Sequence, residues 1–152
     1  MHPEEFRVSR PSTGVKEFWL TSSEELLAIV IAPDRAPEGI QFLTSPTDQF
    51  QIGQLGWKSG HEIEAHSHTK VSRTVNRTSE VLFIRRGKVE VNLYTEDGVF
   101  LTCTILESGD VVALFAGGHG FTILEDADII EVKQGPYIGE EEKFRFLANG
   151  KR

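Results

Sequence analysis

Several features are scarce in this 152-residue chain, and each scarcity excludes a class of protein. Cys103 is the only cysteine, so no disulfide can form within the chain, and a reducing compartment suits it. Acidic residues outnumber basic ones by 23 to 16, and the formal charge of −7 disfavours binding to nucleic acid or to anionic lipid. The longest apolar run, residues 26–32, is too short to cross a bilayer, and the acidic first residues do not resemble a secretory signal. We therefore expect a cytoplasmic protein that binds neither nucleic acid nor a membrane.

Helical periodicity is also lacking, because apolar residues between positions 49 and 134 alternate with polar ones. The alternation and the turn residues predict strands at 26–32, 39–43, 50–55, 81–84, 88–94, 99–106, 111–115, 120–124 and 129–134, with an edge strand near 18–20. Short strands at this spacing are typical of an all-β sandwich or antiparallel barrel, into which Cys103 should point. The length fits a single domain, residues 1–152, with a core barrel at about 26–134, an N-terminal arm at 1–20 and a C-terminal tail at 135–152.

One group of polar residues carries the chemistry of the chain. His66 and His68 stand where a strand is expected, and a spacing of two places both imidazoles on one face of it. Glu80 opens the next apolar strand, and His119 begins a later one. Three imidazoles and a carboxylate suit Fe, Mn, Ni, Co, Cu or Zn. We therefore predict one divalent transition metal bound by His66, His68, Glu80 and His119, with the alternative that Glu80 is a general base instead of a ligand.

The order of these residues resembles the first motif of the cupin superfamily. That motif reads glycine, two histidines, glutamate and glycine, and the matching positions here are Gly60, His66, His68, Glu80 and Gly87. Eleven residues separate His68 from Glu80 where the family has three or four, which implies an insertion at residues 69–79. The second cupin motif is matched by Gly109-Asp110 and by His119, although its usual proline and terminal asparagine are absent.

The resemblance, which covers roughly residues 50–134, implies a jelly-roll antiparallel β-barrel of the cupin type, holding one metal and pairing as a homodimer. Small stand-alone cupins are often associated with sugar-nucleotide and polysaccharide biosynthesis. The leading hypothesis is therefore a metal-dependent enzyme that acts on a small anionic, sugar-derived molecule by an isomerase or epimerase type of step. An Fe(II)-dependent dioxygenase and a non-catalytic metal-assisted sensor are the alternatives.

Two further predictions concern the insertion and the tail. Lys70, Arg73 and Arg77 fall in a stretch, residues 65–79, that contains no acidic residue before Glu80. A basic loop beside a metal would bind an anionic substrate, since arginine pairs well with carboxylate or phosphate; the alternatives are a solvated loop or a dimer contact. Tyr137 is a candidate proton donor in the tail, with packing as the alternative role.

Overall fold

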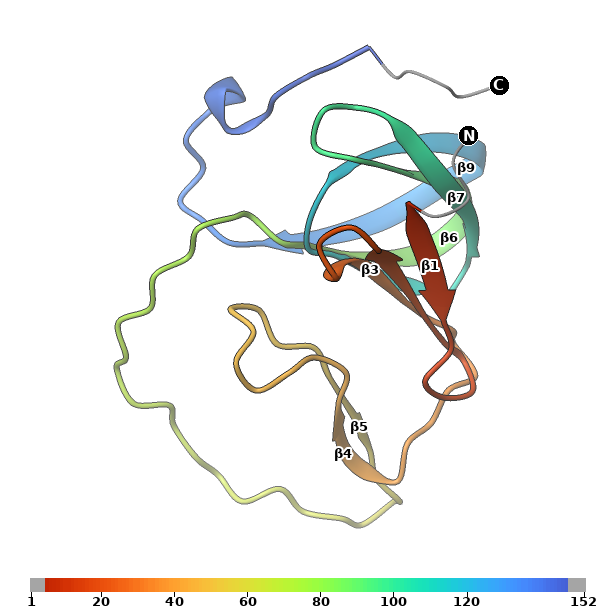
Figure 1. Ribbon diagram of the computed structural model, residues 1–152. Helices are drawn as coiled ribbons and strands as arrows, with labels where there is room; N and C mark the ends of the chain where they lie inside the picture. Colours follow the sequence, from red (N-terminus) through yellow and green to blue (C-terminus); the bar gives the residue numbers. More distant parts are fainter. Residues whose placement is uncertain (1–4, 148–152) are drawn as a thin grey trace. The chain divides into compact units, whose positions relative to one another are not determined.

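The computed structural model describes residues 5–147, which contain nine β-strands and one short 3-10 helix. Contacts divide the chain into two compact units. The large unit comprises residues Met1–Arg35 and Thr78–Arg152, and the small unit comprises Ala36–Arg77. Figure 1 labels most of the strands. The expectation of an all-β, antiparallel protein is confirmed for the described residues.

The large unit is built on one seven-stranded sheet. Its strands are β1 (Phe6–Ser9), β2 (Val15–Leu20), β3 (Glu25–Ile31), β6 (Glu80–Tyr94), β7 (Phe100–Glu107), β8 (Val111–Leu114) and β9 (Gly118–Lys133). The strand order is β1-β2-β3-β8-β6-β7, with β9 paired to β6, and every pairing is antiparallel. Within residues 5–147 no pairing joins the ends of this order, so the sheet is not closed into a barrel.

The core of the large unit lies on one face of this sheet, where alternating apolar side chains meet. It includes Phe18, Ala28, Val30, Leu82, Ile84, Val89, Val91, Leu93, Val112 and Leu114. The members of the apolar core on β6 are even-numbered up to Ile84 and odd-numbered from Val89 to Leu93, because the pairing with β9 shifts register between Ile84 and Val89. Such irregularities bend a strand and increase its twist.

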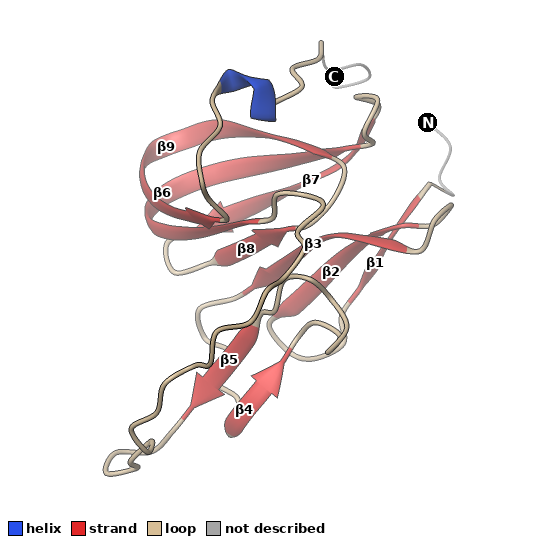
Figure 2. Ribbon diagram, turned by 90° about the vertical axis from the view of Figure 1, so that its left-hand side faces the viewer, coloured by secondary structure: helices blue, strands red, loops and turns tan. Residues whose placement is uncertain are grey.

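The bend of β6 brings residues together that an extended strand would hold far apart. Glu80 opens β6, and His119 pairs opposite Leu93, thirteen positions further along the strand. Thirteen residues of extended strand span about 43 Å, yet the side chains of Glu80 and His119 lie 3.1 Å apart. Figure 2 shows β6, β7 and β9 curving together. The curvature of the sheet therefore creates the polar cluster described below.

Strand β9 corrects the prediction of two strands separated by a turn at residues 125–128. Glu125 and Asp128 lie within one continuous strand and pair with Lys88 and Arg86, on the segment of β6 where the register shifts. Asp128 also forms an ion pair with Arg85 at 3.5 Å. Opposite charges across the strands favour this pairing, so the acidic residues continue the sheet and do not end it.

Two smaller expectations also differ from the structure. The N-terminal arm, expected to be irregular apart from one edge strand, forms both β1 and β2. Cys103, expected to point into the core, is exposed, because it faces away from the side of β7 that carries Leu106 opposite Val89. The tail contains the 3-10 helix Glu140–Glu142.

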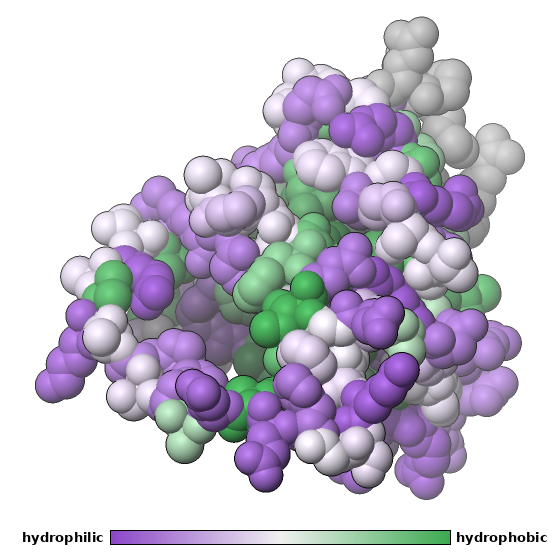
Figure 3. Space-filling view, turned by 90° about the horizontal axis from the view of Figure 1, so that it is seen from below, coloured by the Kyte–Doolittle hydropathy of each residue, from purple (hydrophilic) through white to green (hydrophobic). Residues whose placement is uncertain are grey.

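The small unit consists of the hairpin β4 (Gly39–Phe42) and β5 (Gly53–Gly56), followed by residues 57–77 without regular structure. His66 and His68 are therefore not on a strand, contrary to the prediction, because the segment has no strand to pair with. Large apolar side chains are exposed on this unit, including Phe42 and Leu55. On the face drawn in Figure 3, hydrophobic side chains lie among hydrophilic ones. Among residues 5–147, no helix is both long enough and apolar enough to span a membrane.

Candidate functional site

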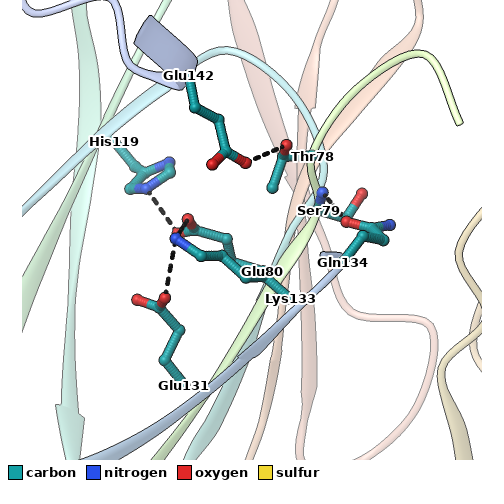
Figure 4. Close-up of polar contacts among 8 residues, drawn as sticks. All are labelled: Thr78, Ser79, Glu80, His119, Glu131, Lys133, Gln134 and Glu142. Atoms are coloured by element: carbon teal, nitrogen blue, oxygen red, sulfur yellow. Dashed lines mark hydrogen bonds and ion pairs between the residues drawn. The ribbon is translucent and has the colours of Figure 1, made fainter. Parts of the chain in front are cut away.

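A buried carboxylate lies at the centre of the polar cluster on the core face of the large unit. Only 8% of Glu80 is exposed. Its Oε2 lies 3.1 Å from His119 Nε2, and its Oε1 lies 3.7 Å from Lys133 Nζ. Lys133 is placed by the β6–β9 register, in which it pairs opposite Glu80. A carboxylate, an imidazole and an ammonium group therefore meet at one end of the β6–β9 pair, as Figure 4 shows.

The neighbours of Glu80 determine its ionisation. The hydrogen bond with His119 is the largest influence and lowers the pKa of Glu80 below its ordinary value. Burial opposes this change, whereas the positive charges of His119, Lys133 and Lys143 lower the pKa further. The pKa of Lys133 is raised, chiefly by its hydrogen bond with Glu131 at 3.2 Å. Glu80 is accordingly ionised and Lys133 protonated at neutral pH.

The segment before β6 and the tail after β9 surround the cluster. Ser79 donates its backbone N–H to the side-chain oxygen of Gln134 at 2.8 Å. The hydroxyl of Thr78 donates a hydrogen bond to Glu142 Oε1 at 2.9 Å. Glu142 Oε2 is buried and has no hydrogen-bond partner among the described residues. The tail thus directs a second acidic side chain at the cluster, from the 3-10 helix (Figure 4).

The small unit presents the two predicted histidines side by side in an exposed segment. The ring centroids of His66 and His68 are 5.4 Å apart, and the rings meet edge to face. His66 Nδ1 lies 2.8 Å from the carbonyl oxygen of Glu64. A carbonyl only accepts, so Nδ1 carries the proton and Nε2 keeps its lone pair. This is the tautomer that metal-binding histidines commonly adopt.

The donor atoms of Glu80 and His119 have the separation of two ligands of one transition metal. Two ligands that each lie about 2.1 Å from an ion and at right angles to each other are about 3.0 Å apart. The 3.1 Å between His119 Nε2 and Glu80 Oε2 is close to that separation. Within residues 5–147 no three His, Cys, Asp or Glu side chains gather closely enough to hold an ion. Each pair is half of the predicted ligand set, and each belongs to a different unit.

The remaining predicted site residues lie in exposed segments. Lys70, Arg73 and Arg77 belong to the irregular part of the small unit, and their side chains are exposed. Tyr137 lies in the tail and is 68% exposed. Their predicted roles, substrate binding for the three basic residues and proton donation for Tyr137, stay predictions.

Three residues near Glu80 were not predicted as part of the site. Lys133 and Glu131 share one face of β9 and form an ion pair at 3.2 Å. Their proximity to Glu80 depends on the long, continuous β9, which the predicted turn at 125–128 concealed. Glu142 reaches the cluster from the tail, and its sequence neighbourhood of consecutive acidic residues resembles an ordinary solvated segment.

Comparisons of the chain with models of known protein families, with curated proteins and with solved structures each found no match. The geometry and chemistry of the cluster around Glu80 are therefore the basis for assigning a function.

Proposed function

We propose that this protein is a metal-dependent enzyme of the cupin type that isomerises or epimerises a small anionic, sugar-derived molecule. The observation that carries the proposal is the buried carboxylate of Glu80 in contact with His119, beside the ammonium of Lys133. Burying a carboxylate is unfavourable unless it is paired. Such clusters of perturbed groups are more frequent at functional sites than elsewhere.

In this proposal the ligand set is His66, His68, Glu80 and His119, brought together in a jelly-roll barrel. The lowered pKa of Glu80 favours the role of ligand over that of general base, because a base works best with a pKa near the operating pH. The metal would polarise a substrate carbonyl as a Lewis acid. Lys70, Arg73 and Arg77 would bind the anionic group of the substrate, for which arginine is well shaped.

The side chains beside Glu80 would then move the proton. Glu131 lies 3.2 Å from Lys133 and would remove a proton from the carbon next to the carbonyl. The C–H electron pair would then form a C=C bond while the C=O π pair moves onto the oxygen, and the ammonium of Lys133 would stabilise this oxyanion. Tyr137 would donate a proton to the opposite face of the same carbon, which gives epimerisation, or, after the hydroxyl proton of that carbon moves to the oxyanion, to the former carbonyl carbon, which gives isomerisation. Proton exchange with solvent would restore Glu131 and Tyr137, so neither reaction involves net oxidation or reduction.

The first test measures the metal. Protein purified without chelator should contain about one divalent metal per chain, and the double variant H66A/H68A should lose it while keeping its circular dichroism spectrum. H61A is the matched control, since His61 is also exposed in the small unit but stacks on Trp57 at 3.9 Å. Absence of metal from the wild-type protein would contradict the proposed ligand set.

The second test measures the reaction. Metal-loaded protein is incubated in D₂O with hexose 6-phosphates and the 4-keto forms of UDP-hexoses, and deuterium incorporation next to the carbonyl carbon is followed by NMR. We expect incorporation by the wild-type protein and a loss of about 10²- to 10⁴-fold in E131Q. Binding without exchange would instead support a sensor, and oxygen consumption with substrate would support a dioxygenase.

A further inference from the structure

The tail of the chain supplies a carboxylate that the proposed reaction does not use. Glu142 Oε1 accepts a hydrogen bond from Thr78, but its Oε2 is buried without a hydrogen-bond partner among the described residues. A buried oxygen without a partner destabilises a protein. Such a group therefore calls for an explanation, and a hydrogen-bond donor on a bound molecule is one.

The position of Glu142 identifies where that molecule lies. In Figure 4 the carboxylate of Glu142 extends from the 3-10 helix toward the side of the cluster that carries Thr78 and His119. Glu142 is also close enough to Lys133 to raise the pKa of that lysine. The unpartnered oxygen therefore belongs to the same site as Glu80 and does not lie on a separate surface.

An aromatic anchor holds the tail over the cluster. The ring of Phe146 packs against Tyr94, with ring centroids 5.5 Å apart. A Cβ added to Gly98 or to Gly118 would lie 2.6 Å from this ring, so the two glycines create the space that it occupies. Gly118 immediately precedes His119, and the anchor of the tail thus adjoins the site. Phe144, in contrast, is 81% exposed and contributes little to the anchoring.

The charges of the cluster restrict what the unpartnered oxygen can bind. Glu80, Glu131 and Glu142 are acidic, whereas Lys133 and Lys143 are the basic residues that affect them. A phosphate or carboxylate would be repelled by Glu142, so the basic loop of the small unit is the better partner for the anionic group. A neutral donor, such as a hydroxyl group, matches a carboxylate oxygen.

We propose that Glu142 is a substrate-binding residue that accepts a hydrogen bond from a hydroxyl group of a polyhydroxylated, sugar-type substrate, and that Phe146 positions it. This inference deepens the proposed function and rests on it. It assigns the recognition of hydroxyl groups to the tail, whereas the anionic group is recognised by the basic loop.

The test compares the affinities of variants for the hexose 6-phosphates and UDP-hexoses, measured by calorimetry with the metal-loaded full chain. E142A should bind the tightest compound of this panel at least about 10-fold more weakly, as expected for the loss of a hydrogen bond to a charged group. E142Q should fall between E142A and the wild-type protein. E141Q, which changes the exposed neighbour in the same 3-10 helix, should bind as the wild-type protein does.

Monodeoxy analogues of that compound identify the hydroxyl group. One analogue should bind the wild-type protein about 10-fold more weakly than the parent compound does. The same analogue and the parent compound should bind E142A equally well, because this variant already lacks the carboxylate that accepts the hydrogen bond. Equal affinity of wild-type and E142A for every compound would overturn the inference and assign Oε2 to a water molecule. Failure of the proposed function would differ from failure of this inference, since it would appear as a missing metal or as missing deuterium exchange in the wild-type protein.

The positioning role of Phe146 has its own readout. F146A should weaken binding to the same extent as E142A and should accelerate tryptic cleavage after Lys143 and Arg145, with the metal content unchanged. F146L, which keeps an apolar side chain in the space beside Gly98 and Gly118, should recover most of the affinity. Wild-type affinity in F146A would show that the anchor does not position Glu142.

Discussion

At the scale of single residues, Glu80 shows how neighbours control a buried acid. Its pKa in the folded chain is below the ordinary value of 4.5, mainly because of the hydrogen bond with His119. A carboxyl group whose pKa is lower in the folded than in the unfolded state stabilises the fold at pH values above the unfolded-state pKa. This contribution is lost as the pH falls through the folded-state pKa.

Replacing Lys133 tests this account in the metal-free protein. K133M should raise the pKa of Glu80, because the ammonium 3.7 Å away no longer favours the ionised carboxylate. The free energy of unfolding in urea should consequently depend less on pH below about 4.5 in K133M than in the wild-type protein. NMR titration of the ¹³C-labelled carboxyl groups measures the pKa directly.

The matched control is K88M, which removes a lysine from β6, the strand that carries Glu80. Lys88 pairs with Glu107 at 2.7 Å, so its loss should leave the titration of Glu80 unchanged. An unchanged Glu80 pKa in K133M would mean that His119 alone accounts for the lowered value.

At the scale of elements, the bend of β6 is the feature that assembles the site. Gly87 lies within the segment of shifted register and has a φ of 93°, a conformation that favours glycine. A Cβ at this position would lie 2.4 Å from the carbonyl oxygen of Asp126 on β9. We expect G87A to lower the free energy of unfolding by about 2–4 kcal/mol and to separate Glu80 from His119.

Gly60 provides the control for backbone strain without steric overlap. Its φ of 85° is similar, but an added Cβ would meet nothing within 4 Å. G60A should therefore lower the free energy of unfolding by only about 1–2 kcal/mol. Equal effects of G87A and G60A in urea denaturation would show that close packing against β9 is not what requires glycine at position 87.

The local elements were more predictable from the sequence than their arrangement. Alternation and the Glu96-Asp97-Gly98 turn predicted the hairpin of β6 and β7, which is confirmed, with Gly98 at a φ of 87°. The predicted strands 81–84 and 88–94 are one bent strand, because pairing with β9 continues through the residues between them. The strand propensity of single residues cannot reveal such a pairing, since the pairing depends on residues about 40 positions away in the sequence.

The residues of the site were likewise more predictable than their arrangement. Residue types identified Glu80 and His119 as members of one site, and the structure places their side chains 3.1 Å apart. Lys133 and Glu142 were missed because their proximity to Glu80 depends on the length of β9 and on the packing of Phe146. The prediction of a strand at His66 and His68 was wrong, because alternation alone cannot supply the neighbouring strand that such a segment must pair with.

At the scale of the whole molecule, the proposed ligand set requires both units to contribute to one metal. Residues 57–77 have no regular structure, and their lysine and arginine side chains, including Lys70 and Arg73, are exposed to a protease such as trypsin. If a metal joins His66 and His68 to Glu80 and His119, this segment should be cleaved about 10- to 100-fold more slowly when the ion is saturating.

The decisive variant lies outside the segment that is cleaved. With Mn²⁺ or Zn²⁺ added to metal-stripped protein, H119A should lose most of the protection, although residue 119 is in the large unit, whereas H61A should keep it. The rate of cleavage after Lys70 and Arg73, followed by mass spectrometry, measures this directly. Full protection in H119A would mean that His66 and His68 bind the ion without the large unit. His66 and His68 belong to the small unit, whereas Glu80 and His119 belong to the large one. A shared metal would then be excluded, and the cluster around Glu80 would have to act without His66 and His68.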